Sequence, residues 1–221
     1  MITNAESETP QTLRAAVFDY GGVMTYPMST AAAGIVPEGL DPLAVRAAMS
    51  RIIDHSSPNT AWARIERGEM SLHEFGEVLD AELPGLSAVF SNVDTLPPSR
   101  LQVRDDMVEF VRNLRQRGIR TALCTNNIAE FRPIWTAKLD CGALFDCVID
   151  SSAVGMRKPE PRMFELVESL VGVPASQSVF VDDIAVNTAA AAAAGFRAVL
   201  VGETDDHFAE LRALFPSDCE S

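Results

Sequence analysis

Residues 15–23 read Ala-Ala-Val-Phe-Asp-Tyr-Gly-Gly-Val, an apolar run that stops at an aspartate and two glycines. The run from Ala15 to Phe18 predicts a buried β-strand with Asp19 at its tip. The glycines that follow carry no Cβ, so backbone there can come close to a ligand. The pattern is typical of a binding site, although the same residues also suit an ordinary tight turn.

Three later segments also combine apolar runs or turns with polar groups, namely Thr121–Asn127, Gly155–Pro161 and Val179–Asn187. Two of them are predicted strands that end in polar side chains, and the third places a lysine in a proline-rich turn before a helical pattern. Taken singly, each also fits a helix cap or a solvated turn. In chain order the polar residues are Thr125, Asn126, Lys158, Asp182, Asp183 and Asn187.

With Asp19, this ordered set resembles the haloacid dehalogenase superfamily, subfamily IA type, whose members are mostly phosphatases. The resemblance runs from Arg14 to about Leu214. The stretches Thr-Ala-Leu-Cys-Thr-Asn, Gly-Met-Arg-Lys-Pro-Glu-Pro and Val-Phe-Val-Asp-Asp-Ile are similar to those of two groups within it. These groups are the phosphatase domains of soluble epoxide hydrolases and the glucose-1-phosphate phosphatases with an Asp-x-Gly motif.

Apolar and helical patterns alternate along most of the chain, which predicts an α/β fold. We expect a Rossmann-like parallel five-stranded sheet with helices on both faces and an inserted helical cap. The predicted strands are Ala15–Phe18, Ile119–Cys124, Cys147–Ile149, Val179–Val181 and Ala198–Val201. The predicted core helices are Arg104–Arg117, Ile128–Leu139, Arg162–Leu170 and Thr188–Ala194.

The domain boundaries follow from a long excursion between the first two strands. Residues 13–23 and 99–215 are predicted to form the core, 24–98 the cap, and 1–12 and 216–221 flexible termini. Helical patterns at Pro42–Asp54, Thr60–Arg67 and Ser71–Leu83 make the excursion too regular for a loop.

The resemblance implies that this insertion is a mobile cap that closes on substrate. Trp62, Arg64 and Glu66 lie near one another at helical spacing within it. Packing inside the insertion is the simplest role for Trp62, with contact to substrate as the alternative for any of the three.

The strand order expected for the family makes Asp19 and Asp183 neighbours, because the crevice of a parallel sheet forms where the order of strands reverses. Two adjacent carboxylates raise each other's pKa, so they either share a proton or hold a metal ion. Hard oxygen ligands and a phosphate substrate favour magnesium.

The resemblance also implies the role of each site residue. Asp19 would attack phosphorus and bind Mg²⁺, and Lys158 would neutralise charge on the nucleophile and the phosphoryl group. The remaining roles are metal ligation by the Gly21 carbonyl and Asp183, phosphate binding by the Thr125 hydroxyl and the Asn126 backbone N–H, and orientation of the metal ligands from behind by Asp182 and Asn187.

One position departs from most phosphatases of the superfamily. They carry a second aspartate two residues after the nucleophile as general acid and base, and here that residue is Gly21. Loss of a positioned acid typically costs ~10²–10⁴-fold in rate. The glucose-1-phosphate phosphatases share this glycine.

Two alternatives remain open. A 2-haloacid dehalogenase attacks carbon and needs neither the second acid nor a metal, but it gains nothing from the pair Asp182 and Asp183. The other alternative is a non-catalytic relative that binds a phosphorylated ligand or a protein.

Composition sets broader limits. The formal charge is −13 and no basic cluster is present, which makes nucleic acid and anionic membrane poor partners for this chain. A small phosphorylated molecule is the expected partner, and the oligomeric state stays open. The first dozen residues lack an apolar signal-peptide core. The four cysteines show no paired spacing, and Cys124 and Cys147 are predicted to be buried thiols, so we expect a cytoplasmic protein.

Overall fold

The computed structural model of the 221-residue chain describes residues 12–27, 36–91, 102–202 and 206–216. The predicted flexible termini, 1–12 and 216–221, lie outside the described residues except for Thr12 and Pro216.

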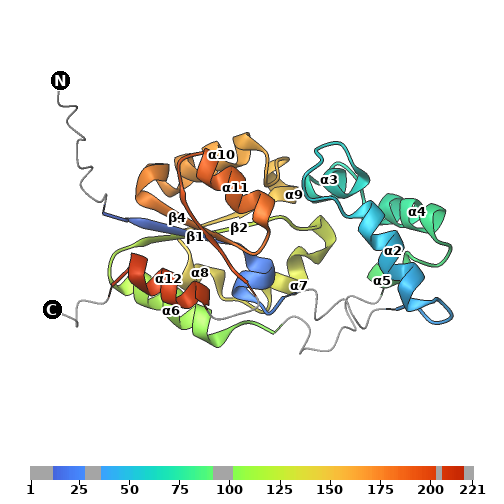
Figure 1. The fold of residues 1–221 in the computed structure, drawn as a ribbon, viewed down its shortest axis with the longest axis horizontal. Helices are drawn as coiled ribbons and strands as arrows, with labels where there is room; N and C mark the ends of the chain where they lie inside the picture. The colour runs from blue at the N-terminus through green and yellow to red at the C-terminus, as the bar shows by residue number, and fades with distance from the viewer. Residues whose placement is uncertain (1–11, 28–35, 92–101, 203–205, 217–221) are drawn as a thin grey trace, which may run out of the picture.

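A five-stranded parallel sheet forms the centre of the molecule (Figure 1). Its order is β3-β2-β1-β4-β5, and every predicted strand is present with its ends shifted by no more than one residue. The strands are β1 (Ala15–Phe18), β2 (Arg120–Thr125), β3 (Cys147–Asp150), β4 (Ser178–Asp182) and β5 (Arg197–Leu200). The predicted α/β fold class is therefore confirmed.

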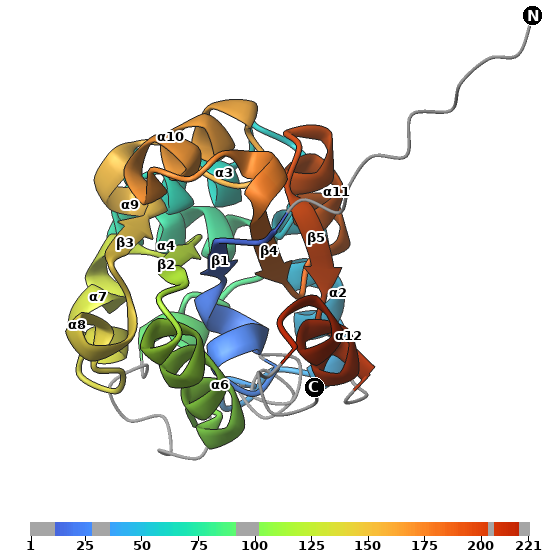
Figure 2. The same cartoon turned by 90° about the vertical axis from the view of Figure 1, so that its left-hand side faces the viewer.

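Helices cover both faces of this sheet (Figure 2). Successive side chains of a strand point to opposite faces. Accordingly, Ala16 and Phe18 of β1 enter one hydrophobic cluster while Ala15 and Val17 enter another. The first cluster contains residues of α6 (Asp105–Gln116), α8 (Cys141–Leu144) and α12 (Asp206–Leu214), and the second residues of α10 (Pro161–Val171) and α11 (Ala185–Ala193). Because β1 is covered on both faces, all of its residues are buried.

Two sequence predictions for the core need correction. A single helix was predicted over Ile128–Leu139, but the chain forms a short turn, η4 (Ala129–Phe131), followed by α7 (Arg132–Thr136). Pro133 lies in the first turn of α7, where its missing N–H is tolerated, whereas inside a longer helix it would break a hydrogen bond. Cys124 is buried as predicted, but Cys147 is only half-buried.

The excursion after β1 forms a helical unit that we call the insertion, described over residues 36–91. It contains α2 (Pro42–Ile52), α3 (Ala61–Glu66), α4 (Leu72–Glu82) and α5 (Ala88–Ser91). Asp41, Thr60 and Ser71 each cap one of these helices by accepting a backbone N–H with the side chain.

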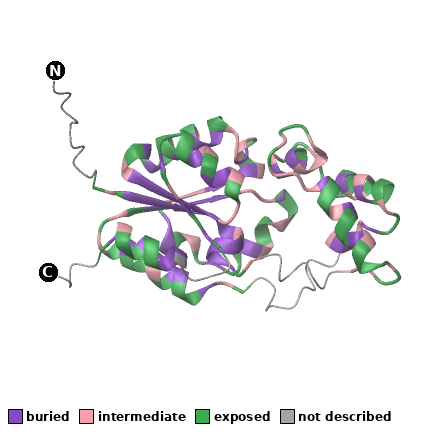
Figure 3. Cartoon of the chain, viewed as in Figure 1, coloured by how far each residue is buried: buried purple, intermediate pink, exposed green. Residues whose placement is uncertain are grey.

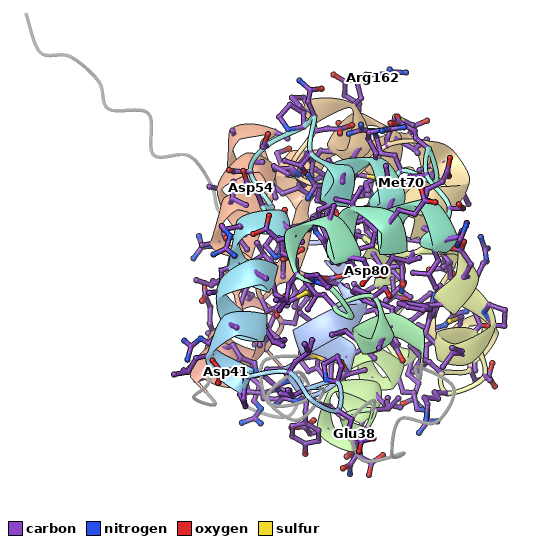
Figure 4. All side chains as sticks on the ribbon, turned by 90° about the vertical axis from the view of Figure 1, so that its right-hand side faces the viewer. Glu38, Asp41, Asp54, Met70, Asp80 and Arg162 are labelled. Atoms are coloured by element: carbon purple, nitrogen blue, oxygen red, sulfur yellow. The ribbon has the colours of Figure 1, made fainter. Side chains whose placement is uncertain are left out.

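The insertion has its own hydrophobic cluster, and Figure 3 shows buried segments along its helices. Ile128 of the core belongs to this cluster and Phe131 packs against it, so the two parts of the chain share packing. The strands of the sheet point their carboxyl ends towards the insertion in Figure 1, and Figure 4 views the molecule from the insertion's side.

The three insertion residues singled out in the sequence have different surroundings. Trp62 packs against the insertion's cluster, Arg64 is exposed, and Glu66 is buried. Within the described residues, no helix is long and apolar enough to cross a membrane.

Candidate active site

The first and fourth strands bring distant carboxylates together. In the register of β1 and β4, Phe18 lies opposite Val181. Asp19 and Asp182 are the next residues, so both leave the sheet at the same level, at the point where the strand order reverses. Carboxylate oxygens of Asp19, Asp182 and Asp183 lie within 4.8 Å of one another. The predicted proximity of Asp19 and Asp183 is confirmed.

Lys158 contacts two of these carboxylates. Its side chain is fully buried, and its ammonium lies 2.9 Å from Oδ1 of Asp19 and 2.6 Å from Oδ2 of Asp182. The third N–H of the ammonium donates a hydrogen bond to the carbonyl of Cys124 at 2.8 Å, so all three donors of the ammonium have acceptors. Burial lowers the pKa of Lys158, but the carboxylates of Asp182 and Asp19 outweigh burial and the net shift is upward. The site therefore contains a fixed positive charge beside Asp19.

The adjacent aspartates have different surroundings. Asp182 is fully buried, and its Oδ1 accepts hydrogen bonds from the Ile184 N–H at 2.8 Å and from Asn187 Nδ2 at 3.0 Å. Its Oδ2 accepts a hydrogen bond from the Lys158 ammonium, so both oxygens are engaged. Asp183 is half-buried. In the described part of the chain, the groups that donate hydrogen bonds to Asp182, namely Lys158, Asn187 and the Ile184 N–H, donate none to the Asp183 carboxylate. Asp182 is thus suited to orienting neighbouring groups, and Asp183 is suited to binding a ligand.

Gly22 lies directly against Asp183. Its φ is 71°, in the left-handed region, and a Cβ built at this position would lie 2.0 Å from Asp183 Oδ2. Neither the backbone conformation nor the space admits a side chain. Gly21, by contrast, has an ordinary φ of −68° and open space where a Cβ would point.

The side-chain amide of Asn126 fixes the backbone of the lysine. Its Nδ2 donates to the Lys158 carbonyl at 2.8 Å, and its Oδ1 accepts from the Lys158 N–H at 2.9 Å. The sequence prediction for Asn126 concerned only its backbone N–H, as a phosphate-binding group. It missed the role of the side-chain amide in fixing the Lys158 backbone. Thr125, the last residue of β2, is buried beside the same site.

The charges of the site favour a cation. Burial raises the pKa of Asp19 from 3.8 to about 8, with Lys158 opposing the shift and the two other carboxylates adding to it. Burial and then Asp182 raise the pKa of Asp183 to about 6. Three carboxylates surround one ammonium among the described residues of the site, so a bound cation would offset the excess negative charge. Clustered carboxylate oxygens fit a hard divalent ion such as Mg²⁺.

The structure also shows a buried residue next to the site that the sequence did not indicate. Arg157 is fully buried and donates from Nε to Oε2 of Glu66 at 2.6 Å. An arginine in a proline-rich turn normally extends into solvent, so nothing in the local pattern distinguishes it.

Comparison with known proteins places the chain in a family. Residues 13–195 match the haloacid dehalogenase-like hydrolases, and the chain belongs to this family.

Among curated proteins, the chain is 28% identical to acyl-CoA dehydrogenase family member 10 of Mus musculus, a match that covers 91% of the chain and 19% of that protein. It is 26% identical to bifunctional epoxide hydrolase 2 of Sus scrofa, covering 94% and 42%. It is 31% identical to a phosphoglycolate phosphatase of Pseudomonas fluorescens, covering 72% and 51%. These matches therefore span between a fifth and a half of the relatives' own lengths.

Solved structures share the fold at lower identity. A predicted haloacid dehalogenase-like hydrolase from Porphyromonas gingivalis aligns with a TM-score of 0.65 at 18% identity, covering 93% of this chain and 99% of that one. An enzyme of the same family from Bacteroides thetaiotaomicron, in complex with magnesium and inorganic phosphate, gives 0.59 at 17%, covering 89% and 98%. L-2-haloacid dehalogenase from Xanthobacter autotrophicus gives 0.59 at 17%, covering 93% and 84%. The fold is thus shared with a protein solved in complex with magnesium and inorganic phosphate and with an L-2-haloacid dehalogenase.

Proposed function

We propose that the chain is a magnesium-dependent phosphohydrolase that acts on a small phosphorylated metabolite through an aspartyl-phosphate intermediate. The observation that carries the proposal is the contact of the Lys158 ammonium with Asp19, beside two further carboxylates within 4.8 Å. Magnesium-and-phosphate binding by the Bacteroides relative and the phosphatase names of other relatives support the same assignment.

In the proposed reaction, a carboxylate oxygen of Asp19 attacks phosphorus and the bond to the leaving oxygen breaks. Water then attacks the aspartyl-phosphate and releases inorganic phosphate and free Asp19. Phosphoryl transfer chiefly requires positioning and neutralisation of charge. Lys158 would neutralise charge beside Asp19, and the Asn126 side chain would position Lys158. Oδ1 of Asp19 contacts Lys158 and accepts the Tyr20 N–H at 2.7 Å, so the carboxylate is held in a fixed orientation for attack.

Mg²⁺ would be held by Asp19, the carbonyl of Gly21 and Asp183, and its charge would offset the repulsion between these carboxylates and an anionic phosphate. Asp182 and Asn187 would orient these groups through their mutual hydrogen bond at 3.0 Å. Thr125 and the Asn126 N–H would hold the phosphate oxygens.

The charge arrangement favours a phosphatase over a dehalogenase. A metal-free attack on carbon has no use for Asp183, which raises the cost of ionising Asp19. A purely binding relative would not need the fully buried contact between Lys158 and Asp19 either.

The missing acid at position 21 restricts the substrate. Tyr20 is a poor replacement, because its ring is buried in the first hydrophobic cluster against Trp135 and burial raises the pKa of its phenol to about 12. Thr25 holds the turn instead, accepting the Gly22 N–H at 3.2 Å. The leaving oxygen must therefore depart with little protonation, which favours anomeric, acyl or aryl phosphates over alkyl phosphates.

The carboxyl ends of the strands point towards the insertion (Figure 1), and we propose that the insertion acts as the cap that limits substrate size. Efficient hydrolysis of phosphoproteins would contradict this role.

The deciding experiment measures hydrolysis of p-nitrophenyl phosphate with and without Mg²⁺, and halide release from 2-haloacids in parallel. We expect phosphate release that disappears with chelator and no halide release. Metal-independent halide release would establish the dehalogenase, and the absence of both would leave a binding protein. A panel of phosphorylated metabolites then identifies the substrate.

A further inference from the structure

Arg157 connects the lysine loop to the insertion. It is fully buried, and all three nitrogens of its guanidinium donate to the insertion. Nε bonds Glu66 Oε2 at 2.6 Å, Nη1 bonds the Ser57 carbonyl at 3.3 Å, and Nη2 bonds the His55 carbonyl at 3.2 Å. Glu66 is itself only 3% exposed, so the pair is shielded from water.

A second set of contacts holds the same two segments together. Arg67 Nη1 lies 2.8 Å from Oε1 of Glu160 and also donates to the carbonyl of Pro58. Gly68 approaches the core so closely that an added Cβ would lie 2.6 Å from the Ser152 carbonyl oxygen. The end of α3 therefore packs against the loop that carries Lys158.

The neighbouring residue, Lys158, is fixed on the other side of the same peptide. Asn126 holds its backbone N–H and carbonyl, and its ammonium contacts Asp19 and Asp182. One peptide unit thus carries a side chain fixed in the insertion and a side chain fixed in the site. An insertion that moved away would either break a buried ion pair or pull the lysine loop with it.

We infer that Arg157 is a positioning residue: its contact with Glu66 of the insertion sets the place of the Lys158 ammonium beside Asp19. The inference rests on the proposed function for the role of Lys158 in turnover. On this inference, the insertion does more than limit substrate size: it also helps to position a catalytic side chain.

The test compares Arg157→Met with the double variant Arg157→Met/Glu66→Leu. The single variant leaves Glu66 buried without a partner and should melt at a lower temperature. The double variant removes both charges, and replacing a buried ion pair by apolar residues often restores stability. Because the apolar pair cannot hold the loop in place, kcat on p-nitrophenyl phosphate should stay about tenfold to a hundredfold low in both, with KM little changed.

A matched control uses the exposed pair Arg51 and Glu82 on the insertion, as Arg51→Met and Arg51→Met/Glu82→Leu. Both control variants should keep wild-type kcat, because exposed pairs contribute little. Recovery of kcat together with melting temperature in the Arg157→Met/Glu66→Leu variant would show a purely structural pair and overturn the inference.

Hydrogen exchange supplies a readout that needs no turnover. In the double variant, peptides over 155–160 and 55–68 should exchange faster together, while peptides of β5 stay unchanged. Unchanged exchange over 155–160 would overturn the inference. If wild-type protein fails to hydrolyse phosphate esters, the proposed function fails and the exchange result alone decides the coupling.

Discussion

Replacing Gly22 by alanine should displace Asp183 from the site. The added Cβ would lie 2.0 Å from Oδ2 and 2.4 Å from Cγ of that carboxylate. Real contacts of this kind do not fall below 3.0 Å, so the two groups must separate by about 1 Å. Asp183 is only half-buried, and its side chain is therefore the part that yields.

The size of the effect follows from that displacement. A misplacement of about 1 Å at a reacting centre can lower turnover by about 10²-fold. Magnesium affinity should fall by about tenfold or more, as it does when groups that orient metal ligands are lost. The left-handed φ of 71° adds about 1–2 kcal/mol of backbone strain for any residue with a Cβ. A strain of this size corresponds to a melting temperature lower by about 2–8 °C.

The assay is a magnesium titration followed by calorimetry, with turnover of p-nitrophenyl phosphate measured at saturating metal. Gly21→Ala is the control, because it makes the same change one residue away, at an ordinary φ and in open space, and keeps the backbone carbonyl. Its magnesium affinity and melting temperature should stay near wild type. Wild-type metal affinity and turnover in Gly22→Ala, or equal damage from Gly21→Ala, would refute the reasoning.

Four further outcomes are expected. Asp183→Asn should abolish turnover and weaken magnesium binding in equilibrium dialysis. Asp182→Asn should chiefly destabilise the fold, by up to about 3–5 kcal/mol, because it removes one of the two carboxylates that contact the buried lysine. A greater loss of metal affinity in the second variant would reverse the two assignments. Asp19→Asn should keep its circular dichroism spectrum yet release no phosphate, since an amide of the same size cannot attack phosphorus, and near wild-type turnover would exclude Asp19 as nucleophile. Gly21→Asp, which the open space admits, should raise the rate on alkyl phosphates relative to aryl phosphates, by up to ~10²–10⁴-fold; an unchanged ratio, in a site that still binds metal, would count against a missing acid. Folding raises the pKa of Asp19 from 3.8 to about 8, so the metal-free protein should lose stability as pH rises from about 4 to 8. The increase in melting temperature on adding Mg²⁺ should grow over the upper part of that range. An equal increase at pH 6 and pH 8 would contradict the predicted pH dependence.

The sequence predicted the sheet and the positions of its polar strand ends because these depend on local patterns. Apolar runs such as Val179–Val181 form buried strands wherever helices cover both faces, and polar residues end or follow β1, β2, β3 and β4. The helix predicted over Ile128–Leu139 failed for a local reason as well, since Pro133 favours a new helix start over continuation.

Local patterns did not separate the roles of neighbouring residues, although the family resemblance had implied that Asp183 binds the metal and Asp182 orients its ligands. Asp182 and Asp183 are chemically identical, and only the contacts of the folded chain show that one is engaged by Lys158 and Asn187 while the other faces Gly22. The same holds for the two glycines after Asp19, of which one is sterically required and the other lies in open space.

The sequence by itself determined the α/β class, the order of the strands' polar ends, and the family to which the chain belongs, because these follow from short-range periodicity and motif order. The tertiary structure decided that Arg157 and Glu66 meet inside the molecule and that the Asn126 side chain holds Lys158 in place. These pairs are 91 and 32 residues apart in the chain. No local pattern encodes such a contact, since whether a charged side chain is buried depends on which distant partner the folded chain places against it.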